Sequence, residues 1–102
     1  MTPEQMFTGK NLEVAIDTVS LVKAQLKTVY WEGKPTTPKS EERRKYWSDY
    51  VEVYSKRLLE HIGIDPFVIA IVKQVIEMFG SLLPAPILAL IKSLLEKIGI
   101  KL

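Results

Sequence analysis

Apolar residues recur at steps of three and four in four stretches of this sequence, and glycine or proline separates each stretch from the next. This period places the apolar side chains on one face of an α-helix, whereas a half-buried strand would alternate at every second residue. The pattern predicts helices over residues 11–31, 41–62, 66–79 and 86–98. We therefore expect an all-α domain.

The ends of these stretches carry residues that start and stop helices. Asn11 and Ser40 are the expected N-caps of the first two helices, and Asp65 and Pro66 fit the cap and first position of the third. Glycine commonly ends a helix in the left-handed conformation, and the four stretches are followed by Gly33, Gly63, Gly80 and Gly99.

The same period predicts which side chains face the core. They are Ala15, Ile16, Val19, Val22, Leu26, Val29 and Tyr30 in the first helix, Trp47, Tyr50, Val51, Tyr54, Leu58 and Ile62 in the second, Val68, Val72, Val75, Ile76 and Phe79 in the third, and Ile87, Leu90, Ile91, Leu94, Leu95 and Ile98 in the fourth.

Residues 54–64 resemble residues 90–100, with seven of eleven positions identical, and both segments end in Leu-Leu-Glu-x-Ile-Gly-Ile. In a helix that ends on a left-handed glycine, the next apolar residue folds back onto the last turn. We therefore expect Ile64 to contact Leu59, and the second copy to repeat this geometry with Gly99, Ile100 and Leu95.

The similarity extends beyond the helix ends, because a connector with two prolines precedes each of the two similar segments. Residues 1–102 are predicted to form one domain of two packed αα-hairpins, with one motif over 11–64 and a second over 65–102. An isolated hairpin of this size would expose its apolar stripe, so the two should pack against each other. The repeat predicts pseudo-two-fold symmetry.

Composition argues against several classes of function. The chain has no cysteine and one histidine, His61, so we expect no metal site, and no cofactor is indicated. The serines lack a nucleophile motif, and no acid–base pair can be assigned. We therefore expect a protein that is not an enzyme. A net charge of +2 makes nucleic acid an unlikely default partner.

The leading hypothesis is a protein–protein interaction module that binds a peptide, or another copy of itself, in an apolar groove between the two hairpins. Excess apolar surface in the second half favours an interface, and a homo-oligomer is expected. Tryptophan, tyrosine and arginine are enriched at binding hot spots. The expected partner-binding residues are Trp31, Arg43, Arg44, Tyr46 and Trp47 near the first connector, and Phe67, Ile71, Phe79, Leu83 and Leu88 along the groove.

Two other functions stay open at this point. Residues 86–102 would form a basic amphipathic helix, which could lie on a membrane surface. The basic residues between Lys34 and Lys45 could bind nucleic acid weakly. The sequence shows neither a signal peptide nor an apolar run long enough to span a bilayer, which predicts a cytoplasmic protein, or one in a host cytoplasm if it is viral. A viral orphan protein fits the missing catalytic signature, and scarce Asn and Cys follow a thermophile trend.

Overall fold

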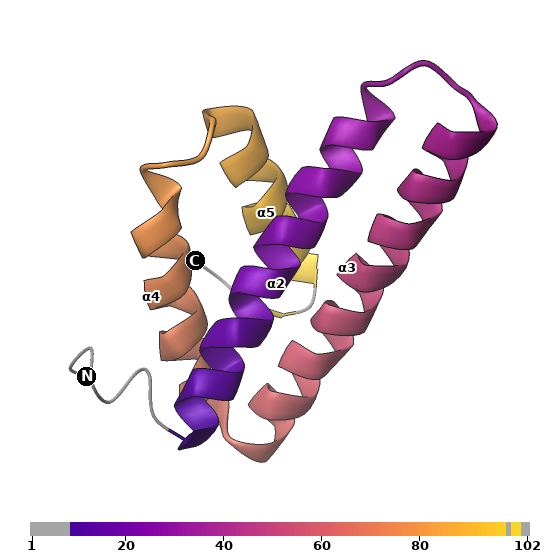
Figure 1. Ribbon diagram of the computed structural model, residues 1–102. Coiled ribbons are helices and arrows are strands. Elements are labelled where there is room, and N and C mark those ends of the chain that lie inside the picture. The colour runs from indigo at the N-terminus through magenta and orange to yellow at the C-terminus, as the bar shows by residue number, and fades with distance from the viewer. Residues whose placement is uncertain (1–8, 98, 101–102) are drawn as a thin grey trace.

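The computed structural model describes residues 9–97, 99 and 100. Its α-helices are α2 (Gly9–Glu32), α3 (Pro38–Ile64), α4 (Ile69–Gly80) and α5 (Ala85–Lys97), and a 3₁₀ turn, η1 (Pro66–Val68), leads into α4 (Figure 1). The prediction of an all-α fold with four helices is confirmed, and the described residues include no strand.

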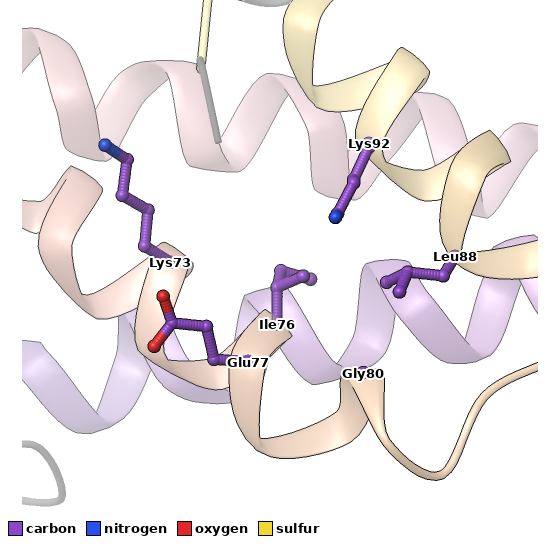
Figure 2. Close-up of a pocket in the computed structure, with 6 residues that line it drawn as sticks. All are labelled: Lys73, Ile76, Glu77, Gly80, Leu88 and Lys92. Atoms are coloured by element: carbon purple, nitrogen blue, oxygen red, sulfur yellow. The ribbon is translucent and has the colours of Figure 1, made fainter. Parts of the chain in front are cut away.

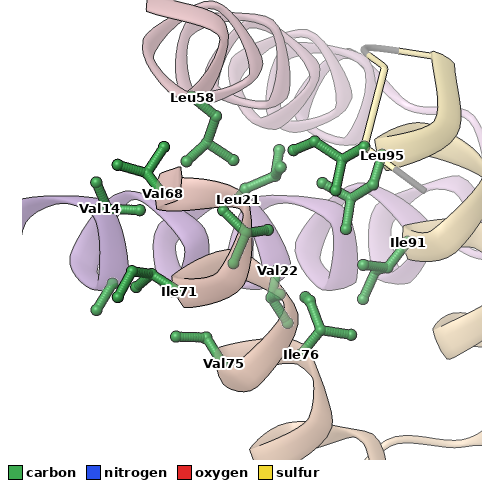
Figure 3. Close-up of a cluster of buried hydrophobic side chains, with 13 residues drawn as sticks. Val14, Leu21, Val22, Leu58, Val68, Ile71, Val75, Ile76, Ile91 and Leu95 are labelled. Atoms are coloured by element: carbon green, nitrogen blue, oxygen red, sulfur yellow. The ribbon is translucent and has the colours of Figure 1, made fainter. Parts of the chain in front are cut away.

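Helix α2 is the centre of the arrangement. Helix α3 runs antiparallel along it on one side, α4 lies on its other side, and α5 lies behind it (Figure 1). Figure 3 shows apolar side chains from all four helices converging on Leu21 and Val22 of α2. The fully buried members of this core include Val14, Leu21, Leu58, Val68, Ile71, Val72, Val75, Ile91, Leu95 and Ile100.

Helix α3 begins earlier than expected because its cap is Thr37, not Ser40. The Thr37 hydroxyl accepts a hydrogen bond from the Ser40 N–H at 3.1 Å, and the Ser40 hydroxyl accepts one from the Thr37 N–H at 2.8 Å. This reciprocal pair is a capping box, and Pro38 fits the first helical position because its φ is already helical. The Asn11 cap was also wrong, since α2 begins at Gly9.

Several side chains predicted to be buried are exposed. Ile16 and Tyr30 are each 53 % exposed, Val19 is 39 % exposed and Leu90 is 46 % exposed. Three neighbouring elements cover α2, and small polar residues fill part of its covered face. Thr18 is one of them, since its hydroxyl donates to the Val14 carbonyl at 2.8 Å and is satisfied inside its own helix. The predicted inward position of Ile98 lies outside the described residues.

The two similar segments end differently. At the end of α5, Gly99 has a φ of +92°, and the Ile100 N–H donates to the Leu95 carbonyl at 2.8 Å. Ile100 is fully buried, so the predicted cap is confirmed there. At the end of α3 it was wrong, because the helix continues through Gly63 to Ile64. The side chain of Ile64 is 76 % exposed.

Candidate interaction surfaces

A groove of about 260 Å³ lies between α4 and α5 (Figure 2). Ile76 and Leu88 supply its apolar lining, and Gly80 leaves room at its end because a Cβ there would lie 3.7 Å from Leu88 Cδ2. Lys73 and Glu77 project from the α4 side, and Lys92 points from α5 across the opening. The groove therefore offers alkyl surface bordered by two ammonium groups and one carboxylate.

A second surface consists of four aromatic side chains on α3: Tyr46, Trp47, Tyr50 and Tyr54. Their rings form a connected series, with centroid distances of 5.1 Å for Tyr46–Trp47, 4.9 Å for Tyr46–Tyr50 and 5.8 Å for Tyr50–Tyr54. Tyr46 is 45 % exposed and the other three are half-buried, so these rings are only partly core residues. We call this series the aromatic surface.

Two shallow hollows border the aromatic surface. One, of about 220 Å³, is shared with Ser20 and Lys23 of α2, and the Lys23 ammonium lies 5.9 Å from the Trp47 ring centroid. The other, of about 350 Å³, is lined by Asp49 and Val53 beside the Tyr46 and Tyr50 rings. The aromatic surface therefore has a basic side next to α2 and an acidic side facing away from it.

Tyr50 shows the electrostatic coupling within this surface. Its pKa is raised above the ordinary value of 10.0, chiefly by a hydrogen bond with Tyr46 and then by repulsion from a tyrosinate at Tyr46. Both effects favour the neutral phenol. The raised pKa means that the Tyr50 hydroxyl stays protonated to a higher pH than that of an ordinary tyrosine.

Arg44 and Trp31 take part in closing the α2–α3 connector. The Arg44 guanidinium donates to the Trp31 carbonyl in the last turn of α2 at 2.9 Å and to the Lys34 carbonyl in the connector at 2.6 Å. The Trp31 ring packs edge-on against Tyr30 at 5.3 Å. Arg44 was expected to bind a partner, but in this structure its side chain holds the connector, whereas Arg43 is exposed.

A polar cluster that the sequence did not reveal joins α2 to the last turns of α3. Asp17 is only 3 % exposed, and its Oδ2 accepts a hydrogen bond from Arg57 Nε at 3.1 Å. His61 Nε2 lies 2.9 Å from the same oxygen. The partners are 40 and 44 residues away in the chain, so no local spacing could indicate the contact. The sequence holds one indication of this cluster: Asp17 is a carboxylate at a core-facing position of α2, between the buried Val14 and Leu21.

The residues expected to line one groove lie in separate places. Ile71 is fully buried in the core and so cannot contact a partner in this structure, whereas Phe67 is 86 % exposed on η1. Phe79 and Leu83 border a hollow of about 160 Å³ against α2, and Leu88 lines the α4–α5 groove. Among the described residues, the five do not form a continuous surface.

Neither a metal-binding cluster nor a membrane span is found in the described part of the chain. No group of three His, Cys, Asp or Glu side chains there could hold a metal ion. None of the described helices is both long and apolar enough to cross a bilayer. Comparison with family models, with curated proteins and with solved structures finds no match to this chain.

Proposed function

We propose that this protein is a non-catalytic interaction module that binds an amphipathic peptide segment in the α4–α5 groove. The observation that carries the proposal is the groove itself, a hollow of about 260 Å³ with Ile76 and Leu88 inside and charged groups at its border. Apolar grooves with a few placed charges are the usual sites for helical or extended peptides. A leucine-sized side chain would cover the exposed alkyl surface of the groove.

The charges at the border favour an acidic ligand. Lys73 and Lys92 contribute two positive charges, and Glu77 contributes one negative charge. Both lysines are exposed, so their attraction to a carboxylate would be screened by salt and would direct the ligand more than it would tighten binding. We therefore expect a segment that combines a large apolar residue with nearby Asp or Glu.

A peptide-display selection against the full-length chain tests this proposal. The enriched peptides should be amphipathic and acidic, and titration of one of them should shift the backbone amide signals of Ile76, Gly80 and Leu88. Lys92→Glu should weaken its binding about threefold at low salt, which corresponds to roughly 0.7 kcal/mol, mainly through slower association. Lys97→Glu is the matched control, because it makes the same charge change on α5 outside the groove.

Three results would contradict the proposal. Enrichment of basic peptides would reverse the expected charge preference. Shifts confined to α3 would move the binding site, and preferential binding to anionic vesicles would favour a membrane surface over a peptide as the partner.

We also propose, on the sequence repeat alone, that the two halves are copies of one hairpin motif. Residues 54–64 and 90–100 share seven of eleven positions, which supports a common origin. Under this proposal the α4–α5 groove is the gap between the helices of the second hairpin. Fragments 1–64 and 65–102 test this division of the chain, since two self-contained hairpin motifs should pair when mixed and raise the helical circular dichroism signal above the sum of the separate fragments. No gain of helical signal on mixing would contradict it.

A further inference from the structure

We propose that α3 pairs antiparallel with α3 of a second copy of this chain, through a stripe along one exposed side of the helix. The stripe consists of Arg43, Tyr46, Tyr50, Val53, Arg57 and Glu60. Tyr50 is half-buried and the other five are exposed. The stripe borders α2 on one edge, where Tyr46 and Tyr50 share a hollow with Ser20 and Lys23 of α2, and Arg57 Nε donates to Asp17. This surface is distinct from the α4–α5 groove, so the proposal does not depend on peptide binding there.

The spacing of the stripe is that of a coiled-coil seam. Its positions follow one another at steps of three, four, three, four and three, which is the heptad pattern of helices that pair side by side. The centre is the least polar part, with Val53 48 % exposed and Tyr46 45 % exposed. Helix α3 has 27 residues and is therefore about 40 Å long, enough for several layers of contact.

The charges of the stripe select the antiparallel direction. In a parallel pair each residue would meet its own copy, which would place Arg43 beside Arg43, Arg57 beside Arg57 and Glu60 beside Glu60. In an antiparallel pair with its two-fold axis between Tyr50 and Val53, Arg43 meets Glu60 of the second copy. Opposite charges in register favour this pairing, and like charges disfavour the other.

The inner layers of the antiparallel pair are also complementary. Tyr50 meets Val53 of the second copy, and Tyr46 meets Arg57, whose side chain is 52 % exposed although its Nε already donates to Asp17. An arginine over a tyrosine ring is a favourable cation–π contact, and Arg57 already lies 5.9 Å from the Tyr54 ring centroid within its own chain. Symmetry repeats each layer twice, as a self-complementary interface requires.

A second pair of charges flanks the seam. At the edge of the stripe, Asp49 of one copy faces Lys56 of the other, and both are exposed. Lys56 forms an ion pair with Glu52 on its own helix at 3.0 Å, but the Lys56 side chain is 68 % exposed and can reach across. The acidic hollow beside Tyr46 and Tyr50 would then lie along the interface.

Charge reversal across the pair is the sharpest test, because Arg43 and Glu60 are 17 residues apart and cannot meet within one helix. Sedimentation equilibrium of the full chain should show a dimer. Arg43→Glu and Glu60→Arg should each raise the dimer dissociation constant about tenfold or more. Combining the two substitutions should restore it to within about threefold of the unmodified chain, since the pair is then reversed rather than broken.

Lys45→Glu is the matched control, because it makes the same charge change on α3 away from the stripe and should leave the dissociation constant unchanged. Circular dichroism verifies that each variant keeps its helix content. A chain that stays monomeric at millimolar concentration would overturn the proposal. A dimer that is insensitive to Arg43→Glu and Glu60→Arg, or that the double reversal does not restore, would overturn it as well.

Cross-linking then tests the direction of the pair. The chain has no cysteine, so single cysteines can be introduced freely. A Tyr46→Cys chain mixed with an Arg57→Cys chain should form the mixed disulfide in preference to either homodimer, because only that pair brings the two positions together. Preferential cross-linking of Tyr46→Cys to itself would indicate the parallel arrangement and contradict the proposal.

Discussion

The ends of α3 and α5 have nearly the same sequence and different structures. Both contain Leu-Leu-Glu-x-Ile-Gly-Ile, yet α5 stops before its glycine and α3 continues through it. Gly99 is left-handed, with a φ of +92°, whereas Gly63 is an ordinary helical residue. Ile100 is fully buried and Ile64 is 76 % exposed. A capping sequence therefore permits a cap without requiring one.

The residues that follow account for the difference. After Ile64 comes Asp65, which is extended, with φ −143° and ψ 99°, because Pro66 disfavours a helical conformation in the residue before it. The Asp65 N–H still donates to the His61 carbonyl at 2.9 Å, so the α-helical ladder runs to this point. The break thus falls at Asp65, two residues after the glycine that was expected to make it.

The two ends are also held by different forces. Near the end of α3, Arg57 and His61 bond to the buried Asp17 carboxylate of α2. At the end of α5, the buried Ile100 packs in the core with Leu95. One end is fixed by a polar contact between residues 40 or more positions apart, and the other by apolar burial. Substitutions at corresponding positions of the two helix ends should therefore change the free energy of unfolding by different amounts.

The largest difference in the free energy of unfolding is expected between alanine substitutions of Ile100 and Ile64. Ile100→Ala should lower the free energy of unfolding by about 2–5 kcal/mol, because it removes a fully buried side chain and leaves a cavity. Ile64→Ala should change it by about 0.5 kcal/mol or less, since most of that side chain is already in water. Urea unfolding measures both, and equal losses would mean that Ile64 is covered in solution.

The next largest effect is expected at the polar contact. Asp17→Ala should cost about 1.5–3 kcal/mol, because it removes the acceptor shared by Arg57 and His61. Glu13→Ala, one turn earlier and exposed, is the control and should cost about 0.5 kcal/mol or less. Thermal unfolding compares the two variants. An Asp17→Ala chain as stable as the control would show that apolar packing alone holds the end of α3.

This contrast also marks how far the sequence could predict the structure. Helix existence followed from local apolar periodicity, and the stop at Gly99 followed from the preference of glycine for the left-handed conformation. The cap at Thr37 could have been read from Thr37, Pro38 and Ser40 together, but Ser40 alone is also an acceptable cap. The predicted helix end at Gly63 was wrong because two local signals compete there. The capping glycine favours an end at residue 63, whereas Pro66 favours an end at Asp65, and α3 follows the proline.

Side-chain burial was harder to predict because it depends on neighbours that are distant in sequence. Ile16 and Val19 lie at helical spacing with Val22, yet Val22 is 5 % exposed whereas Ile16 is 53 % and Val19 39 % exposed. For the same reason the sequence could name the aromatic residues of α3 but not the face they share with Ser20 and Lys23. The five groove residues were grouped by hydrophobicity, but they are spread over η1, α4, the α4–α5 connector and α5, and Ile71 is buried.

Two glycine substitutions should have opposite signs. No atom lies within 4 Å of a Cβ added at Gly63 or at Gly99, so only the backbone conformation distinguishes them. Gly99→Ala should lower the free energy of unfolding by about 1–2 kcal/mol, because a left-handed conformation strains any residue with a Cβ. Gly63→Ala should raise it by about 0.5–1 kcal/mol, because alanine favours a helix interior. Urea unfolding of both variants, measured side by side, gives the two signs. A loss at Gly63 would place that glycine in a left-handed cap, as at Gly99.

The smallest effect is expected at Asp65, and it tests why α3 passes its glycine. The Asp65 carboxylate accepts a hydrogen bond from the Phe67 N–H at 3.0 Å and so caps η1. Asp65→Ala should cost about 1 kcal/mol, whereas Asp65→Asn should cost a few tenths, because asparagine caps nearly as well. Thermal unfolding gives these values, and the amide signal of Gly63 reports the backbone. If Pro66 sets the break, Gly63 stays helical in both variants. A shift of Gly63 to the left-handed region in Asp65→Ala would mean that the cap, and not the proline, keeps the two ends different.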